Sequence, residues 1–302
     1  MDGILNIYKT TGMTSFDVVS RIRKLCQTKK VGHAGTLDPD ASGVLPVCVG
    51  KATKVIEFLM DKTKAYRVGL LLGAATDTQD SSGEVLYEKP VRVSQEDIEN
   101  TIKSFLGETT QIPPMYSAIR VNGQRLYELA RKGVEVDRKP RPVNFLSLEI
   151  LSINRENDKV RVIFDVECSK GTYMRTLCHD IGEKLGCGGH MASLLRTRSG
   201  PFSIDNAYKL DELEEKKDTN MLDSILIPMD FALNSLPSVM VSHSDAKRLK
   251  NGLNLLIYAL LSGFVRVYHE SGCFIAIGKV LTTENDTELR IHKWIGDQSI
   301  GL

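Results

Sequence analysis

The sequence has no long hydrophobic run and no dense cysteine framework, and these absences exclude several classes of protein. No stretch approaches the ~20 apolar residues that cross a bilayer, and the nearest candidate, 253–261, is short and contains Asn254. The N-terminus lacks the apolar core of a signal peptide. The cysteines do not have the spacing of a disulfide framework (26, 48, 168, 178, 187 and 273). We therefore expect a cytoplasmic protein with reduced thiols and no membrane contact.

The sequence also has little net charge, +1 over 302 residues, which argues against a uniformly basic nucleic-acid binder. The charge is nevertheless uneven. Residues 1–67 contain 11 Lys and Arg against 6 Asp and Glu, whereas residues 205–230 contain 3 against 8. This asymmetry is compatible with one face that meets a polyanion, although an ordinary solvated surface would also produce it.

One stretch, VGHAGTLDPDASGVLPVCVGKATK at residues 31–54, combines four glycines and two prolines with mostly small or apolar residues. This composition predicts a tightly packed loop that leads into a buried strand. Asp38 precedes Pro39, which favours an extended backbone and lets the carboxylate project. Read alone, the Asp-Pro pair indicates a turn. A phosphate-binding P-loop is excluded, because six residues separate Gly43 from Gly50 and Ala52 follows Lys51.

The whole string GHAGTLDPxASGVLPVxVGxATK resembles the signature of the TruB family of tRNA pseudouridine synthases. Three further segments resemble the same family, KTTGMTS at 9–15, PPMYSA at 113–118 and CSKGTYMRTL at 168–177. The chain departs from the family pattern at Thr10, where a proline usually stands.

The resemblance implies a catalytic aspartate at Asp38, with Tyr66 and Arg175 as further catalytic residues. It also implies substrate-binding roles for His33, Tyr66, Tyr173 and Leu194. From the residues alone, the better interpretation of Tyr66 on the predicted strand 64–73 is a core tyrosine. The acidic segment DTQDSSG at 77–83 lacks the spacing of a calcium loop and indicates a hairpin or loop.

A metal site is not expected. The His and Cys residues between 178 and 190 suggest zinc, but no pair has the spacing of known zinc sites (Cys178, His179, Cys187 and His190). Breaking a C–N glycosidic bond and rebuilding the link through C5 needs no redox group, so no cofactor is implied either.

The resemblance implies an α+β pseudouridine synthase fold, with a mixed, largely antiparallel central sheet and flanking helices, followed by a small PUA-like β-barrel. We expect the catalytic domain to span residues 1–232 and the PUA-like domain residues 236–302, with 231–239 as a linker. One helix is predicted to end at Cys26, with Thr14 or Ser15 as its capping residue, and another from Ser94 to Leu106, with Ser94 as its capping residue. Strands are predicted at 159–168, 264–268 and 274–279.

The function implied is isomerisation of uridine 55 in the tRNA T-loop, by a monomer that acts alone on the T-arm stem-loop. Two alternatives stay open. A non-catalytic RNA-binding protein should lack the Asp, Tyr and Arg set, which is present in this sequence. A related synthase that requires guide RNA and protein partners usually has terminal extensions, which we do not expect here.

Overall fold

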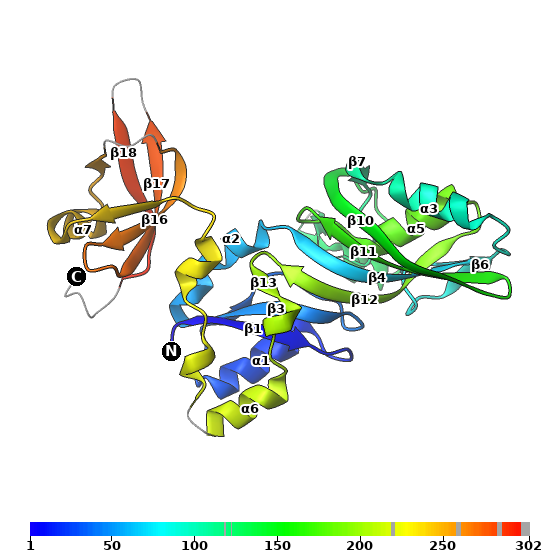
Figure 1. The fold of residues 1–302 in the computed structure, drawn as a ribbon, viewed down its shortest axis with the longest axis horizontal. Helices are drawn as coiled ribbons and strands as arrows, with labels where there is room; N and C mark the ends of the chain where they lie inside the picture. The colour runs from blue at the N-terminus through cyan, green and yellow to red at the C-terminus, as the bar shows by residue number, and fades with distance from the viewer. Residues whose placement is uncertain (118, 122, 219–220, 258–260, 283–285, 297–302) are drawn as a thin grey trace.

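A computed structural model of the protein describes residues 1–117, 119–121, 123–218, 221–257, 261–282 and 286–296. Part of the apolar run at 253–261 and the last six residues of the predicted PUA-like domain therefore lie outside the described residues. The chain forms a large sheet with helices packed on it and a separate, smaller sheet near the C-terminus (Figure 1). No helix in the described ranges is long and apolar enough to cross a bilayer.

The large sheet has nine strands in the order β1-β3-β12-β4-β11-β10-β7, with β2 paired to β3 and β13 to β12. The strands are β1 (Gly3–Lys9), β2 (Val31–His33), β3 (Ser42–Val49), β4 (Lys64–Leu72), β7 (Gly107–Gln111), β10 (Arg141–Glu156), β11 (Lys159–Cys168), β12 (Gly189–Ser199) and β13 (Phe202–Ser203). Neighbours are antiparallel except β12 and β3, which are parallel. The expected mixed, largely antiparallel sheet is confirmed.

Two groups of helices cover the sheet. Alpha helices α1 (Ser15–Leu25) and α6 (Leu210–Asp218) pack with β1 and β3, and α3 (Gln95–Lys103) and α5 (Met174–Lys184) pack with β4, β10 and β11. Leu194 on β12 contacts both hydrophobic clusters, so it lies where the two groups meet. The candidate site occupies this junction.

Side-chain capping sets the start of both predicted helices. Thr14 caps α1 and Ser94 caps α3, each in a capping box with an aspartate at the third helical position, Asp17 or Asp97. Such boxes satisfy backbone N–H groups that a helix start otherwise leaves unpaired. The predicted starts are confirmed, and both helices end one to three residues earlier than predicted.

The smaller sheet has five strands in the order β14-β16-β17-β18-β15. Its elements are β14 (Ser238–Val241), α7 (His243–Lys250), β15 (Leu255–Leu256), β16 (Gly263–His269), β17 (Phe274–Thr282) and β18 (Thr287–Trp294). The predicted strands at 264–268 and 274–279 are confirmed as parts of β16 and β17. This sheet has its own apolar cluster, which includes Val265, Val267 and Leu289.

The prediction of a linker at residues 231–239 is wrong for the first part of that segment. The segment begins inside the 3-10 helix η4 (Met229–Leu233), where Ala232 and Leu233 are fully buried. They belong to a third cluster on the opposite face of β1 and β3, which also includes Ile277 of β17. The start of the segment is therefore packed structure, because its apolar residues fill the space between the two sheets.

Shorter elements connect these parts. They are η1 (Gly50–Val55), α2 (Ile56–Met60), the hairpin of β5 (Ala74–Thr76) and β6 (Val85–Glu88), the hairpin of β8 (Arg120–Val121) and β9 (Gln124–Arg125), α4 (Leu126–Ala130), η2 (Ile204–Asn206) and η3 (Asp223–Ile225). Helix α2 faces the smaller sheet, where the Phe58 ring packs edge-on against Phe264 at 5.1 Å between ring centroids.

Candidate active site

The loop that joins β2 to β3 carries Asp38 and is held in place by hydrogen bonds from two sides. The Ser15 hydroxyl at the start of α1 accepts from the Leu37 N–H at 2.9 Å and donates to the Leu37 carbonyl at 3.1 Å. The Gly12 N–H donates to the Pro39 carbonyl at 3.0 Å. The residues on either side of Asp38 are thus fixed, while its side chain remains 43% exposed.

A buried lysine supplies a further tie to this loop. Lys9, at the end of β1, is fully buried, and its ammonium donates to the carbonyls of Thr10 (3.0 Å), Met13 (2.7 Å) and Pro39 (3.1 Å). Burial lowers the pKa of Lys9 to about 8, and the nearby charge of Asp38 opposes that shift. Because its three donors satisfy three carbonyls, Lys9 joins the end of β1, the following turn and the Asp38 loop.

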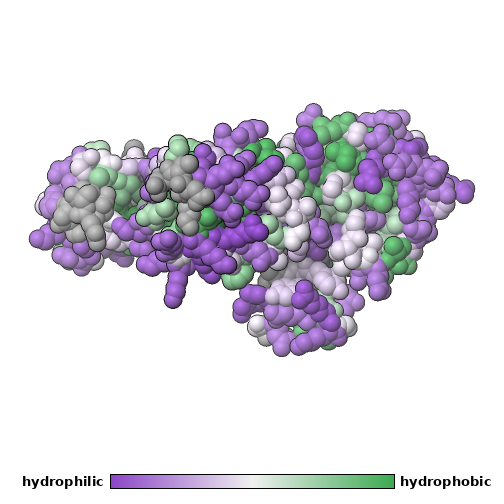
Figure 2. All heavy atoms as spheres, turned by 90° about the horizontal axis from the view of Figure 1, so that it is seen from below, coloured by the Kyte–Doolittle hydropathy of each residue, from purple (hydrophilic) through white to green (hydrophobic). Residues whose placement is uncertain are grey.

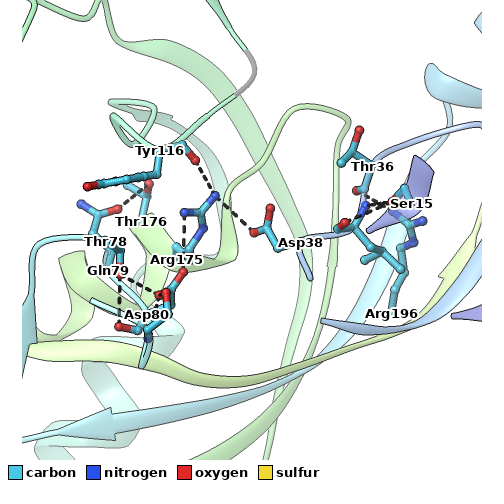
Figure 3. Close-up of polar contacts among 12 residues, drawn as sticks. Ser15, Thr36, Asp38, Thr78, Gln79, Asp80, Tyr116, Arg175, Thr176 and Arg196 are labelled. Atoms are coloured by element: carbon cyan, nitrogen blue, oxygen red, sulfur yellow. Dashed lines mark hydrogen bonds and ion pairs between the residues drawn. The ribbon is translucent and has the colours of Figure 1, made fainter. Parts of the chain in front are cut away.

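Arg175, in the first turn of α5, lies against Asp38. Its Nη2 is 3.2 Å from Asp38 Oδ2, and the arginine side chain is only 8% exposed (Figure 3). The same Nη2 donates to the Tyr116 carbonyl at 2.8 Å, and Nη1 lies 3.6 Å from Asp80 Oδ2. The guanidinium therefore bridges three segments that are distant in the sequence, and two of the residues expected to be catalytic, Asp38 and Arg175, are in contact.

Asp80 is a site residue that sequence reasoning missed. The acidic segment 77–83 forms the predicted turn, but the turn aims one carboxylate at Arg175. Asp80 Oδ1 accepts from the hydroxyls of Thr78 and Ser82, each at 2.6 Å, whereas Asp77 Oδ1 accepts from the Glu84 N–H within the hairpin. No local signal separates these two aspartates, because only the tertiary fold brings one of them to Arg175.

Tyr66 and Arg196 face each other on neighbouring strands, as direct partners in the register of β4 and β12. The ring of Tyr66 packs against the cluster that contains Val68 and Leu70, so it is partly a core residue, as the alternative reading held. Burial raises the pKa of the Tyr66 phenol, and the charge and a hydrogen bond of Arg196 oppose that rise. The charge of Asp38 adds to the rise in the pKa of Tyr66.

The other predicted substrate-binding residues lie on β2, on β12 and at the start of α5. Tyr173 is the N-cap residue of α5, and the Gln111 side chain holds its backbone, accepting from the Tyr173 N–H at 3.0 Å and donating to the Tyr173 carbonyl at 3.2 Å. Burial raises the pKa of Tyr173, which also senses Asp38. His33, on β2, is half-buried, and burial followed by the charge of Arg196 lowers its pKa. Leu194 lies where the two helix groups meet.

Exposed cations gather on residues 120–141, the cationic segment, which begins a few residues after Tyr116. This segment holds the β8-β9 hairpin and α4, and its exposed cations are Arg120, Arg125, Arg131, Lys132, Lys139 and Arg141. Two of them, Arg125 and Arg131, lie over the ring of Tyr127 at 5.8 and 5.5 Å. The face of the molecule in Figure 2 is mainly hydrophilic, with hydrophobic side chains in small separate groups, as suits a polar partner.

The described residues contain no cluster of three or more His, Cys, Asp or Glu side chains that could hold a metal ion. Of the four residues considered for zinc, Cys178 and Cys187 are buried, and His190 Nδ1 lies 3.0 Å from the Ala74 carbonyl. The absence of a metal requirement stays a prediction.

Comparison with known proteins gives two family matches and many relatives. Residues 23–174 match the model described as TruB family pseudouridylate synthase (N terminal domain), and residues 175–234 match the tRNA pseudouridylate synthase B C-terminal domain. The chain is 47% identical over 286 residues to tRNA pseudouridine synthase B of Clostridium perfringens (strain SM101 / Type A), covering 92% of this chain and 95% of that protein. It is 45% identical over 285 residues to the Bacillus subtilis (strain 168) protein of the same name, covering 92% of each.

Solved structures agree with the fold. The chain resembles a structure described as a Cbf5-Nop10-Gar1 complex, with a TM-score of 0.75, 29% identity and coverage of 98% of this chain and 86% of that one. It also resembles an H/ACA RNP bound to a substrate RNA containing 2'-deoxyuridine, with a TM-score of 0.73, 27% identity and coverage of 99% and 86%. These matches extend over both sheets, so the expected α+β fold with a PUA-like C-terminal part is confirmed.

Proposed function

Because this chain belongs to the TruB family and is a tRNA pseudouridine synthase, we propose that it converts uridine 55 of the tRNA T-loop to pseudouridine, acting alone. The proposal of a T-loop target is supported by the four sequence segments that resemble the family. Independence from guide RNA is supported by identity over nearly the full length to bacterial tRNA pseudouridine synthases B, against 29% to the Cbf5 complex structure.

The single observation that carries the proposal is the pairing of Asp38 with Arg175. The reaction breaks the bond between ribose C1' and uracil N1 and joins C1' to C5 instead. A carboxylate can start such a step if it is ionised, fixed in direction and shielded from bulk water. A buried guanidinium 3.2 Å from Asp38 fixes the direction of the carboxylate. The proposed role of Asp38 is attack on the ribose, attack on the base or removal of a ribose proton.

Tyr66, Tyr173, His33 and Leu194 are proposed to hold the uridine. A base inside a folded loop must leave its stack before chemistry, and an aromatic and apolar pocket replaces the lost stacking. The charge of Asp38 raises the pKa of both phenols, and Leu194 packs against both helix groups, which supports a position of these three side chains close to the carboxylate.

The exposed cations on residues 120–141, with the basic excess of residues 1–67, are proposed to contact the phosphates of the T-arm. Contacts of this kind give affinity that depends on salt and not on sequence. Arg175 donates to the Tyr116 carbonyl just before the cationic segment, so RNA bound there lies next to the catalytic groups.

We further propose a catalytic domain at 1–232 and a PUA-like domain at 236–302 in a monomeric, cytoplasmic enzyme without cofactor or metal. The end of the second family match at residue 234 supports this boundary. The cytoplasm is where a tRNA substrate is available. The reaction moves one proton from C5 to N1 without a change of oxidation state, so acid–base and nucleophilic side chains are sufficient.

Release of the C5 hydrogen tests the proposed function directly. Purified protein should release tritium from [5-³H]uridine in unmodified tRNA with no guide RNA or second protein present. Replacing uridine 55 with cytidine should abolish that release, and replacing a neighbouring uridine should not. Binding without release would support a non-catalytic RNA-binding protein, and release only after guide RNA and partners are added would support the guide-dependent alternative.

A further inference from the structure

Arg196 is a fully buried arginine to which the proposed function assigns no role. It is 1% exposed and lies on β12, where its backbone pairs with Gly43 of β3 on one side and Tyr66 of β4 on the other. Its guanidinium donates to the carbonyls of Val44 (2.6 Å), Gly35 (3.0 Å) and Thr36 (3.4 Å). Within the described ranges, no carboxylate forms an ion pair with it.

A buried cation without an anion is costly, because hydrogen bonds to carbonyls satisfy its donors but leave its charge in place. The charge of Arg196 therefore produces a positive potential in the floor of the site. The group beside it that can accept a negative charge is the Tyr66 hydroxyl, because Tyr66 is the direct partner of Arg196 in the register of β4 and β12 and its side chain lies on the same face of the sheet. Arg175, by contrast, is paired with the carboxylates of Asp38 and Asp80.

The reaction has to move one proton from C5 to N1, and a phenol beside a buried cation can carry out this transfer. Uridine has hydrogen on C5 and none on N1, whereas pseudouridine has hydrogen on N1 and none on C5. One phenol can carry out the exchange: its proton passes to N1, and the resulting phenolate takes the proton from C5, which restores the phenol. No outside acid, base or oxidant is consumed, and between the two transfers the negative charge is on the phenol oxygen.

We infer that Arg196 is a positioning residue that fixes the Tyr66 oxygen in the site and stabilises its negative charge during this proton exchange. The inference rests on the proposed function. The opposing effects on Tyr66 agree with it, since burial raises the phenol pKa and Arg196 holds that rise back. A preorganised charge at an atom that becomes negative during a reaction is an effective form of catalytic stabilisation.

The test compares Arg196→Met, which removes the charge, with Arg196→Lys, which keeps the charge but loses the planar set of donors. Arg198→Lys is the matched control: Arg198 is two residues away on β12, and its guanidinium pairs with Glu167 at 2.5 Å. Each protein is assayed at saturating tRNA carrying uridine or [5-²H]uridine at position 55, after thermal unfolding confirms that it is folded.

Arg196→Met should lower turnover by about 100-fold, within the range of a lost acid–base contribution, and should increase the deuterium isotope effect because C5 proton removal becomes limiting. Arg196→Lys should recover part of the rate, and Arg198→Lys should match the unaltered enzyme. A slow Arg196→Met enzyme without a larger isotope effect would show that Arg196 only supports the loop and would overturn the inference, as would unchanged turnover.

If Arg196→Met does not fold, Tyr66→Phe provides the test, because it removes the oxygen on which Arg196 acts. Its turnover should fall by at least about 100-fold, the loss expected for an acid–base group, because the phenol that exchanges the proton is gone, and normal turnover would overturn the inference. Failure of the proposed function is distinguishable, because in that case the unaltered enzyme would itself release no C5 hydrogen from position 55.

Discussion

At the scale of single residues, the site depends on how charge is distributed around one guanidinium. Arg175 contacts Asp38, Asp80 and the Tyr116 carbonyl, and its side chain is 8% exposed. Removing one partner of a buried ion pair destabilises a protein by more than the pair stabilises it, because the other charge then stays buried without a partner. Arg175 has a second carboxylate, so the loss of Asp38 does not leave it alone.

Replacing Asp38 with Asn should therefore abolish chemistry without unfolding the protein. The substitution keeps the size of the side chain and the loop geometry, and no neighbouring carboxylate replaces the lost one. We expect turnover to fall by several orders of magnitude, as when a nucleophile is removed from other enzymes, while tRNA binding stays near normal. C5-hydrogen release and filter binding measure the two effects. A folded Asp38→Asn protein that keeps a tenth of the activity would contradict the assignment.

Asp80→Asn tests the residue that the sequence did not reveal. The amide keeps the size of the side chain and an oxygen for Thr78 and Ser82, but it weakens the hold on Arg175 Nη1. We expect a loss of about 10- to 100-fold in turnover, consistent with about 1–3 kcal/mol for a charged hydrogen bond. Asp77→Asn is the matched control from the same turn and should be nearly normal. Equal effects of both substitutions would show that only the turn matters.

The site residues that could be predicted from the sequence are those in motifs. Asp38 and Arg175 lie in segments that resemble the family, and the structure pairs their side chains. Asp80, Lys9 and Gln111 could not be assigned, since their roles depend on contacts with residues 95, 30 and 62 positions away. Local patterns cannot show which of several similar side chains a distant segment will meet.

At the scale of elements, local chemistry determines where helices begin, and packing determines the rest. The capping boxes of α1 and α3 were predictable from a Thr or Ser three positions before Asp. The linker prediction failed because Ala232 and Leu233 give no local sign that another sheet covers them. The turn that follows β1 also depends on packing. Lys9, which is buried, holds this turn against the catalytic loop, and Thr10 stands where the family usually has a proline.

This lysine predicts a pH dependence of stability. Burial lowers the pKa of Lys9 from an ordinary 10.5 to about 8, so between these values the unfolded chain binds more protons than the folded one. Stability must then rise with pH across that window. Relative to Lys9→Met, the unfolding free energy of the unaltered protein should rise by about 2 kcal/mol between pH 8 and 9.5. Urea unfolding of both proteins measures it, and a constant difference would contradict the shifted pKa.

At the scale of the whole molecule, the two sheets are joined by a packed and charged contact. Phe58 of α2 packs against Phe264 and His292, and Glu57 accepts from Lys293 at 2.7 Å. Ile277 of β17 is fully buried in a cluster shared with the larger sheet. The proposed PUA-like domain is therefore held in one position relative to the site, which suits a part that contacts tRNA away from the reacting uridine.

Removal of residues 236–302 should separate stability and binding from chemistry. Every proposed catalytic or substrate-binding residue lies at or before Leu194, so turnover at saturating tRNA should change little. Thermal stability should fall, because Phe58 and the shared cluster lose their apolar contacts to Phe264 and Ile277. Affinity for tRNA should weaken, since part of the contact surface is gone. Calorimetry, filter binding and C5-hydrogen release measure the three quantities.

Phe264→Ala in the full chain is the control, because it loosens the same contact and leaves the smaller sheet present. It should lower stability less than truncation does and keep most of the affinity. If the truncated protein is insoluble, Phe58→Ser in the same truncation removes the ring that would otherwise be exposed. A soluble, folded truncated protein that binds tRNA at saturation yet turns over slowly would contradict the division at residue 236, because chemistry would then depend on the smaller sheet.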